Sequence, residues 1–382
     1  MHRLRVRGNA GFSLIELMVG IVVALICTLA IMAAFAVFEG QKRTTTNGDD
    51  AQQNGSYALY YLERQIRTAG SGIVQGNKWG LWGCPMTAKT AGVVQLGAVP
   101  AAPFTIWPAT TRAMSVLISA GPNDASGNPT SDVIGIVSGS PAARVFKAAV
   151  TSTPSATSVV LANSFGIFSG DYLIGVPSTG TCALALTNTA PDATGSITFD
   201  GNNTAAAGLS GAAYAFDLGP DPIISLYGVD PTTNSLVTLD LLGRKINGVA
   251  ATNVPIADGI VIIKALYGVH DVSSACQTAG QNANCIDEWV SPAAGTPWAI
   301  GTINASVSSA SAAMTAIKAV RVVVVAQSRL AQRTTDYTGN ATISLFKDIP
   351  SLTMVVTTDI RYRYKVYDTT IPIRNGLIQK YF

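Results

Sequence analysis

The chain of 382 residues is long enough to bury a sizeable core, and only 12% of its residues are charged. So low a charge content, with 36 glycines, disfavours a cytosolic enzyme and is typical of an envelope or extracellular β-rich protein. The net charge is +3, but Arg3, Arg5 and Arg7 precede an apolar stretch, and the other 22 basic residues balance 22 acidic ones. The basic bias therefore belongs to the N-terminus and gives no support to nucleic-acid binding.

Residues 12–38 form the apolar stretch, in which Glu16 is the only charge. As a helix it would be about 40 Å long, enough to cross a bilayer core of about 30 Å. The preceding arginines predict a cytoplasmic N-terminus, with the rest of the chain on the other side. A secretory signal peptide cleaved after Ala34-Phe35-Ala36 and a plain membrane anchor are two alternatives. The stretch is longer than the usual signal-peptide run, and neither alternative gives Glu16 a role.

The residues around Glu16, Gly11-Phe12-Ser13-Leu14-Ile15-Glu16, resemble the recognition sequence of type IV prepilins and pseudopilins. The resemblance implies that a prepilin peptidase cleaves between Gly11 and Phe12, removes the basic leader 1–11 and methylates Phe12. Residues 12–38 would remain as a transmembrane and filament-core helix. Glu16 would then pair with the N-terminal amine of a neighbouring subunit and set the axial register, because a lone carboxylate among apolar helices needs a partner.

The same resemblance has one departure, which concerns the continuity of this helix. Many major pilins carry a helix-breaking proline in the segment, but residues 12–38 contain no proline, and Gly20 is their only weak point. The sequence therefore contains no proline that would predict partial unwinding of this helix in a filament.

Residues 39–70 are expected to continue the helix in amphipathic form. Leu59, Leu62 and Ile66 fall at i, i+3 and i+7, which predicts a helix from about Asp49 to Thr68 packed on a sheet. Five glycines punctuate the segment, three weakening the helix and two ending it: Gly40, Gly48, Gly55, Gly70 and Gly72.

Residues 71–382 are expected to form one β-rich head, because no repeat and no long linker divides them. Short apolar runs predict strands at 115–120, 132–139, 171–176, 223–229 and 259–269. Turn clusters separate them at 121–129, 199–203 and 219–222, and residues 306–320 are expected to begin as a short helix. The predicted fold is α+β: a long N-terminal helix whose lower half packs on an antiparallel sheet with an enlarged β-rich head.

Cysteine usage suits an oxidising compartment. Cys27 lies in the apolar stretch and is expected to be a small buried apolar residue, while the other four cysteines form an even set. Their spacing does not fix the pairing. The nine-residue step from Cys276 to Cys285 suggests a local link, which leaves Cys84 with Cys182 by elimination. Four free thiols in a reducing compartment are the alternative.

No catalytic, metal or cofactor site is predicted in the head. His270, beside Asp271 at a strand end, lacks a nucleophile motif and is expected to be a solvated loop histidine. Zinc-site and nucleotide-site spacings are absent, and the Asp-rich segments 200–203 and 217–221 are interpreted as turns rather than Ca²⁺ sites. A basic and aromatic cluster near the C-terminus is interpreted as the two opposite faces of a strand, not a DNA groove: Arg361, Arg363, Lys365, Tyr362, Tyr364 and Tyr367.

Three segments resemble the PilW group of minor pilins: 58–72, followed by Cys84, then 317–328 and 360–376. The resemblance implies a non-catalytic subunit that primes or caps a type IV pilus. Its partners would be the prepilin peptidase, other minor pilins, the major pilin and the inner-membrane assembly machinery of a Gram-negative bacterium, with the head in the periplasm. A J-type pseudopilin of type II secretion is the nearest alternative. A membrane-anchored enzyme or adhesin is another, and would need a convergent polar pocket in the middle of the chain.

Overall fold

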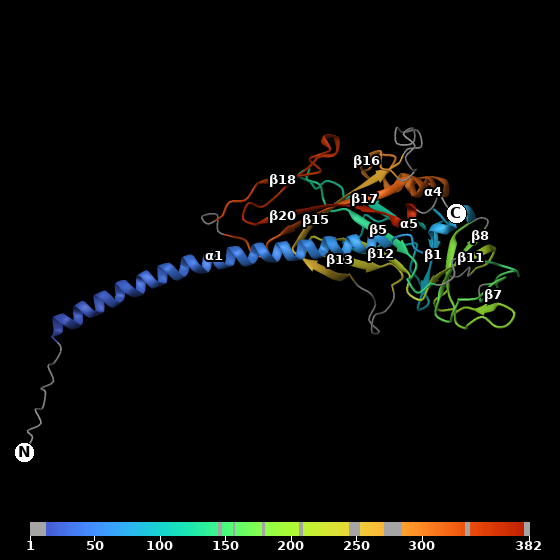
Figure 1. The fold of residues 1–382 in the computed structure, drawn as a ribbon, viewed down its shortest axis with the longest axis horizontal. Helices are drawn as coiled ribbons and strands as arrows, with labels where there is room; N and C mark the ends of the chain where they lie inside the picture. The colour runs from blue at the N-terminus through green and yellow to red at the C-terminus, as the bar shows by residue number, and fades with distance from the viewer. Residues whose placement is uncertain are drawn as a thin grey trace, which may run out of the picture.

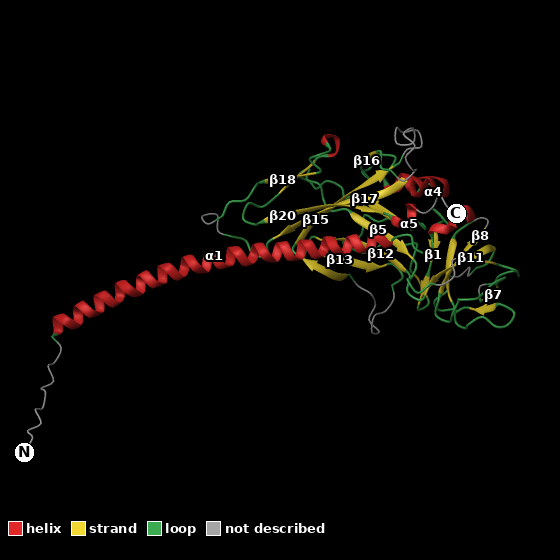
Figure 2. Cartoon of the chain, in the orientation of Figure 1, coloured by secondary structure: helices red, strands yellow, loops and turns green. Residues whose placement is uncertain are grey.

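The computed structural model describes residues 13–143, 147–155, 157–177, 180–205, 209–243, 253–270, 285–332 and 337–377. The leader, the predicted cleavage site Gly11–Phe12, Asp271 and Cys276 lie outside the described residues. One long helix runs into a β-rich head, so the α+β prediction is confirmed (Figure 1, Figure 2).

The long helix α1 (Leu14–Thr68) has 55 residues and no break. The helix continues past Phe38, as expected, and the glycines expected to weaken it do not interrupt it, because each lowers helix stability by only about 1 kcal/mol. The helix ends where it was expected to end: Gly70 has a φ of +80°, and its N–H donates to the carbonyl of Val137 at 2.8 Å. This bond fastens the end of α1 to the head.

A four-stranded antiparallel sheet holds the C-terminal half of α1. Its order is β16 (Glu288–Val290), β15 (Ile260–Val269), β17 (Ile317–Gln327) and β20 (Tyr364–Pro372), and α1 packs on β17 and β20. Both faces of this sheet are covered. Val320, Val322 and Val324 share a core with α1, whereas Val323 and Val325 pack under the hairpin of β18 (Thr342–Leu345) and β19 (Met354–Thr357). The continuous valine run of β17 follows from burial on both faces.

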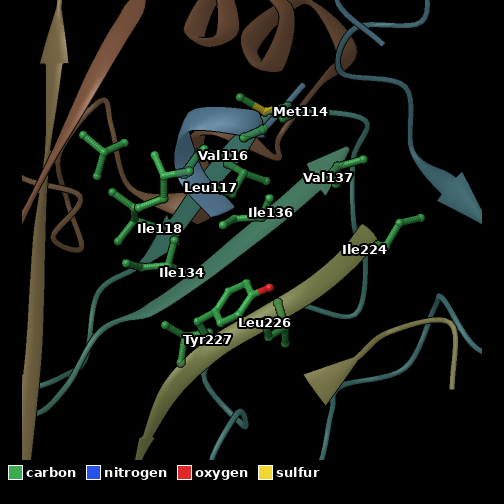
Figure 3. Close-up of a cluster of buried hydrophobic side chains, with 14 of the residues drawn as sticks. Met114, Val116, Leu117, Ile118, Ile134, Ile136, Val137, Ile224, Leu226 and Tyr227 are labelled. Atoms are coloured by element: carbon green, nitrogen blue, oxygen red, sulfur yellow. The ribbon is translucent and has the colours of Figure 1, made fainter. Parts of the chain in front are cut away.

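A second, five-stranded antiparallel sheet completes the core around α1. Its order is β14 (Val254–Asp258), β13 (Ser235–Asp240), β12 (Ile223–Asp230), β5 (Val133–Ser138) and β4 (Val116–Ser119). Figure 3 shows Ile118, Ile134 and Leu226 of three adjacent strands gathered in one cluster. The same core contains Leu62 and Ile66 of α1, both 0% exposed, so the helix is integral to the head.

A third sheet lies in a lobe at the end of the head far from the N-terminus (Figure 1). It has the order β1 (Met86–Thr87), β9 (Cys182–Leu186), β8 (Tyr172–Pro177), β11 (Ala212–Gly219) and β6 (Ala148–Ala149). The antiparallel pair of β7 (Ser158–Val160) and β10 (Ser196–Thr198) adds its apolar side chains to a separate small core. Short elements complete the described chain: η1 (Val74–Trp79), β2 (Lys89–Thr90), β3 (Val93–Val94), α3 (Ile300–Ile303), α4 (Val307–Ala316), η2 (Pro350–Leu352) and α5 (Arg374–Leu377).

The interpretation of the C-terminal basic and aromatic cluster needs correction. Strand β20 begins at Tyr364, so Arg361 and Arg363 precede it. Tyr364 packs against the β18–β19 side, whereas Tyr367, three residues later, packs on the α1 side. The two rings lie on opposite faces because an odd step along a strand reverses the side chain.

Candidate functional site

The N-terminal half of α1 is the most unusual surface of the described chain. Leu14–Glu39 is apolar enough to cross a membrane, and none of it is buried by the head. Every large apolar side chain from Leu14 to Phe38 exposes at least 52% of its surface. Such a surface is stable only against lipid or other apolar helices. With its N-terminal position, it indicates membrane anchoring.

Glu16 lies in the first turn of this helix, as its only acid there. Its N–H donates to the carbonyl of Ser13 at 3.0 Å, and its residue is exposed. A carboxylate at this position is favoured by the partial positive charge of the helix N-terminus. Cys27, expected to be buried, is instead exposed and free on the same bare helix.

Hydrogen bonds from the head to backbone carbonyl groups hold the C-terminal half of α1. Asn375 Nδ2 donates to the carbonyls of Thr68 at 3.2 Å and Ala69 at 3.0 Å, and Ser138 Oγ donates to Thr68 at 3.0 Å. Further down, the Tyr367 hydroxyl donates to the carbonyl of Gln52 at 3.0 Å. The bonds to Thr68 and Ala69 satisfy carbonyl groups that a helix end otherwise leaves unpaired, whereas the bond to Gln52 is an additional contact inside the helix. These hydrogen bonds fix the C-terminal half of α1 to the head, and the apolar N-terminal half extends from it.

Cys84 and Cys182 form a disulfide across 98 residues, with their Cα atoms 5.9 Å apart. It ties the segment after η1 to β9, at the junction of the lobe with the rest of the head. Cys285 is also disulfide-bonded. The bonded cysteines agree with an oxidising compartment.

The expectation of a solvated His270 was wrong. Its side chain is only 4% exposed, and its Nδ1 lies 2.8 Å from Asp287 Oδ2. Sequence reasoning missed this pair because the two residues are 17 positions apart in the sequence and meet only through the antiparallel pairing of β16 with β15. Cys285 Sγ lies 3.6 Å from His270 Nδ1 but is held in a disulfide, so it is no nucleophile in this state.

The Asp-rich segment 200–203 forms a turn, as interpreted, whereas the segment 217–221 was wrongly interpreted as a turn throughout: its first three residues end β11 and its last two form a bend. Asp200 accepts hydrogen bonds from Asn203 Nδ2 at 2.7 Å and the Asn202 N–H at 2.8 Å, and these bonds lower its pKa. Asp217 accepts from the Gly219 N–H at 2.7 Å. Carboxylates that bond their own backbone two residues on are typical of Asx turns.

Two charged networks were missed by sequence reasoning. Lys264 Nζ lies 2.6 Å from Asp132 Oδ1, and their side chains are 4% and 2% exposed. The sequence did contain one indication of this ion pair: Lys264 lies inside the apolar run 260–269, and a buried charge of this kind requires a partner. At the surface, Arg321 bridges Asp348 and Asp368, and these hydrogen bonds raise the pKa of the arginine.

Two large cavities open on the head. One of about 650 Å³ lies between α1 and the β13–β14 region and is lined by Asp50, Asp230 and Asp258. The other, of about 690 Å³, is lined mainly by Pro, Val, Ile and Thr side chains near β19. In this described part of the chain, neither lining contains His, Cys or Lys.

Two known family models match the chain, one near its N-terminus and one over its C-terminal part. Residues 226–375 match the family described as Type IV Pilus-assembly protein W, PilW, and residues 6–32 match the prokaryotic N-terminal methylation motif. No curated protein and no solved structure matches the chain. The PilW match runs from β12 into α5 and contains the sheet that holds α1, while β1 to β11 fall outside it. Together the two matches are those of a PilW-like type IV pilin.

Proposed function

We propose that the chain is a minor pilin, a structural subunit that primes or caps a type IV pilus with other minor pilins. The observation that carries the proposal is the division of α1 into a bare apolar half and a half built into the head. The first half would lie in the inner membrane and then in the core of the filament. The second would fix the orientation of the head.

The N-terminus would be prepared for assembly by a prepilin peptidase. Cleavage between Gly11 and Phe12 removes the basic leader, and methylation of Phe12 follows. The leader would be cytoplasmic and the head periplasmic, because the arginines of the leader resist translocation. Intact-mass analysis should find a methylated Phe12 start in cells with the peptidase and the leader retained without it. A mature chain that starts after Ala36 would contradict the proposal.

Glu16 would act as a charge partner within the bundle of apolar helices. With no water between the helices, its carboxylate is stabilised by the N-terminal amine of the adjacent subunit, either the major pilin or another minor pilin. Only one axial position brings the two charges together, so the pair sets the register.

The substitution Glu16→Ala tests this role, with Glu39→Ala as the matched control at the other end of the apolar half. We expect Glu16→Ala to be processed and inserted normally but to enter sheared pili, measured by immunoblot, much less than wild type. Glu39→Ala should enter normally. Equal incorporation of both variants would contradict the role of Glu16. Normal piliation together with failed protein secretion in a deletion strain would instead assign the chain to type II secretion.

No chemical reaction belongs to this proposal. The head would act through its surfaces on the inner-membrane machinery and on neighbouring subunits.

A further inference from the structure

His270 and Asp287 lie at the end of the paired strands β15 and β16. Val269 is paired with Glu288, so His270 and Asp287 occupy the next step of the antiparallel ladder. The His270 N–H donates to the carbonyl of Ala316 at 2.9 Å, and the Asp287 N–H donates to Val269 at 2.9 Å. Their side chains are 4% and 14% exposed. Backbone bonds and burial thus hold both side chains in place without a ligand.

Cys285 places a third type of ligand atom beside His270 and Asp287. Its Sγ lies 3.6 Å from His270 Nδ1 and 3.8 Å from Asp287 Oδ1, and Nδ1 lies 2.8 Å from Asp287 Oδ2. Tetrahedral zinc, with bonds of about 2.0–2.3 Å to nitrogen, oxygen and sulfur, places its ligand atoms roughly 3.3–3.7 Å apart. The two distances from sulfur are close to this range already. The nitrogen–oxygen pair needs to open by only about 0.5 Å.

The oxidation state of Cys285 decides whether the sulfur is available. In the structure Cys285 is disulfide-bonded, and a disulfide sulfur is a poor ligand compared with a thiolate. A dithiol reductant transfers two electrons and two protons to the sulfur–sulfur bond, giving two thiols, while the reductant becomes a disulfide. The Cys285 thiol then releases its proton to solvent as Sγ binds the metal.

We propose that His270 Nδ1, Cys285 Sγ and Asp287 bind one zinc-class divalent cation when the disulfide of Cys285 is open. Water takes the fourth position, because Cys285 and Asp287 lie on the solvent side of the site. This site is independent of the role in a pilus, and the linear spacing of its residues gave no zinc signal.

Two serine variants separate loss of the disulfide from loss of the ligand. Cys276→Ser removes the predicted partner and leaves Cys285 as a free thiol, whereas Cys285→Ser removes the ligand itself. Each is purified as the full chain in detergent and titrated with Co²⁺, which gives a thiolate charge-transfer band, and then with Zn²⁺. We expect one bound metal and the band for Cys276→Ser, and neither for Cys285→Ser.

The wild-type chain and a carboxylate variant provide the remaining tests. Oxidised wild type should bind no Zn²⁺, and wild type treated with a dithiol should bind one. Adding Asp287→Asn to Cys276→Ser should weaken Zn²⁺ binding on the order of tenfold or more. Equal binding by the two serine variants, or no binding by dithiol-treated wild type with its circular dichroism unchanged, would overturn the proposal.

Discussion

Replacing Lys264 by methionine tests whether the buried ion pair joins the two sheets around α1. Lys264 lies on β15 of one sheet, and Asp132 immediately precedes β5 of the other. Asp132 also accepts the N–H groups of Gly121 and Ala265, both at 2.9 Å. Methionine preserves most of the length of the lysine side chain but removes its ammonium group. The Asp132 carboxylate is then left buried with only these two donors.

The expected loss follows from this burial. Removing one partner of a buried pair costs about 3–5 kcal/mol, because the other charge is left without compensation. The two remaining N–H donors stabilise the carboxylate, so the lower end, about 3 kcal/mol, is expected for Lys264→Met. This lowers the folded-to-unfolded ratio by roughly two orders of magnitude.

The loss should depend on pH. Burial raises the pKa of Asp132, and Lys264 opposes that effect, so removing Lys264 raises the pKa further. Above the unfolded value of about 3.9, the native state of the variant then holds a proton that the unfolded state has released. Its stability therefore falls as the pH rises from about 4 through the folded pKa. Lys264→Met should be destabilised less at pH 4.5 than at pH 7.

Urea unfolding of the intact chain in detergent, followed by tryptophan fluorescence, measures both effects. Lys365→Met, at an exposed lysine of β20, is the matched control and should change stability by less than about 0.5 kcal/mol. Asp132→Asn added to Lys264→Met removes the buried charge and should restore part of the loss at pH 7. A loss below about 1 kcal/mol for Lys264→Met, or an equal loss at both pH values, would refute the reasoning.

Three further variants test how the head is assembled. A methyl group on Gly55 would collide with the Tyr367 ring, so Gly55→Ala should lower the free energy of unfolding by about 1–3 kcal/mol. Gly48 has open space around it, so Gly48→Ala should raise the free energy of unfolding by about 0.5–1 kcal/mol in the same assay. The reverse order would contradict packing of α1 on β20. Replacing Cys84 and Cys182 together by serine should cost about 2–5 kcal/mol, because their link closes a long loop. An unchanged melting temperature under non-reducing conditions would contradict that.

Local patterns were sufficient for much of the fold. The predicted strand at 132–139 corresponds to β5 (Val133–Ser138), and that at 259–269 corresponds to β15 (Ile260–Val269). Such runs can be recognised because apolar and β-branched residues between turn residues favour strands whatever their partner. The helix after Phe38 was harder to predict. Its glycines were expected to weaken it, and nothing in the sequence explained their presence; in the structure Gly55 is the point at which the Tyr367 ring packs on α1, where a side chain would collide with the ring.

The sequence by itself determined the apolar segment, the motif around Glu16 and the α+β class, since each depends on residues that are close along the chain. The tertiary structure alone decided which distant side chains meet. Lys264 and Asp132 are 132 residues apart, and His270 and Asp287 meet only because β16 returns beside β15. The period of a strand shows which face is buried, but it does not specify the neighbouring strand or its register. The buried charges and the His270–Cys285–Asp287 cluster therefore became visible only in the folded chain.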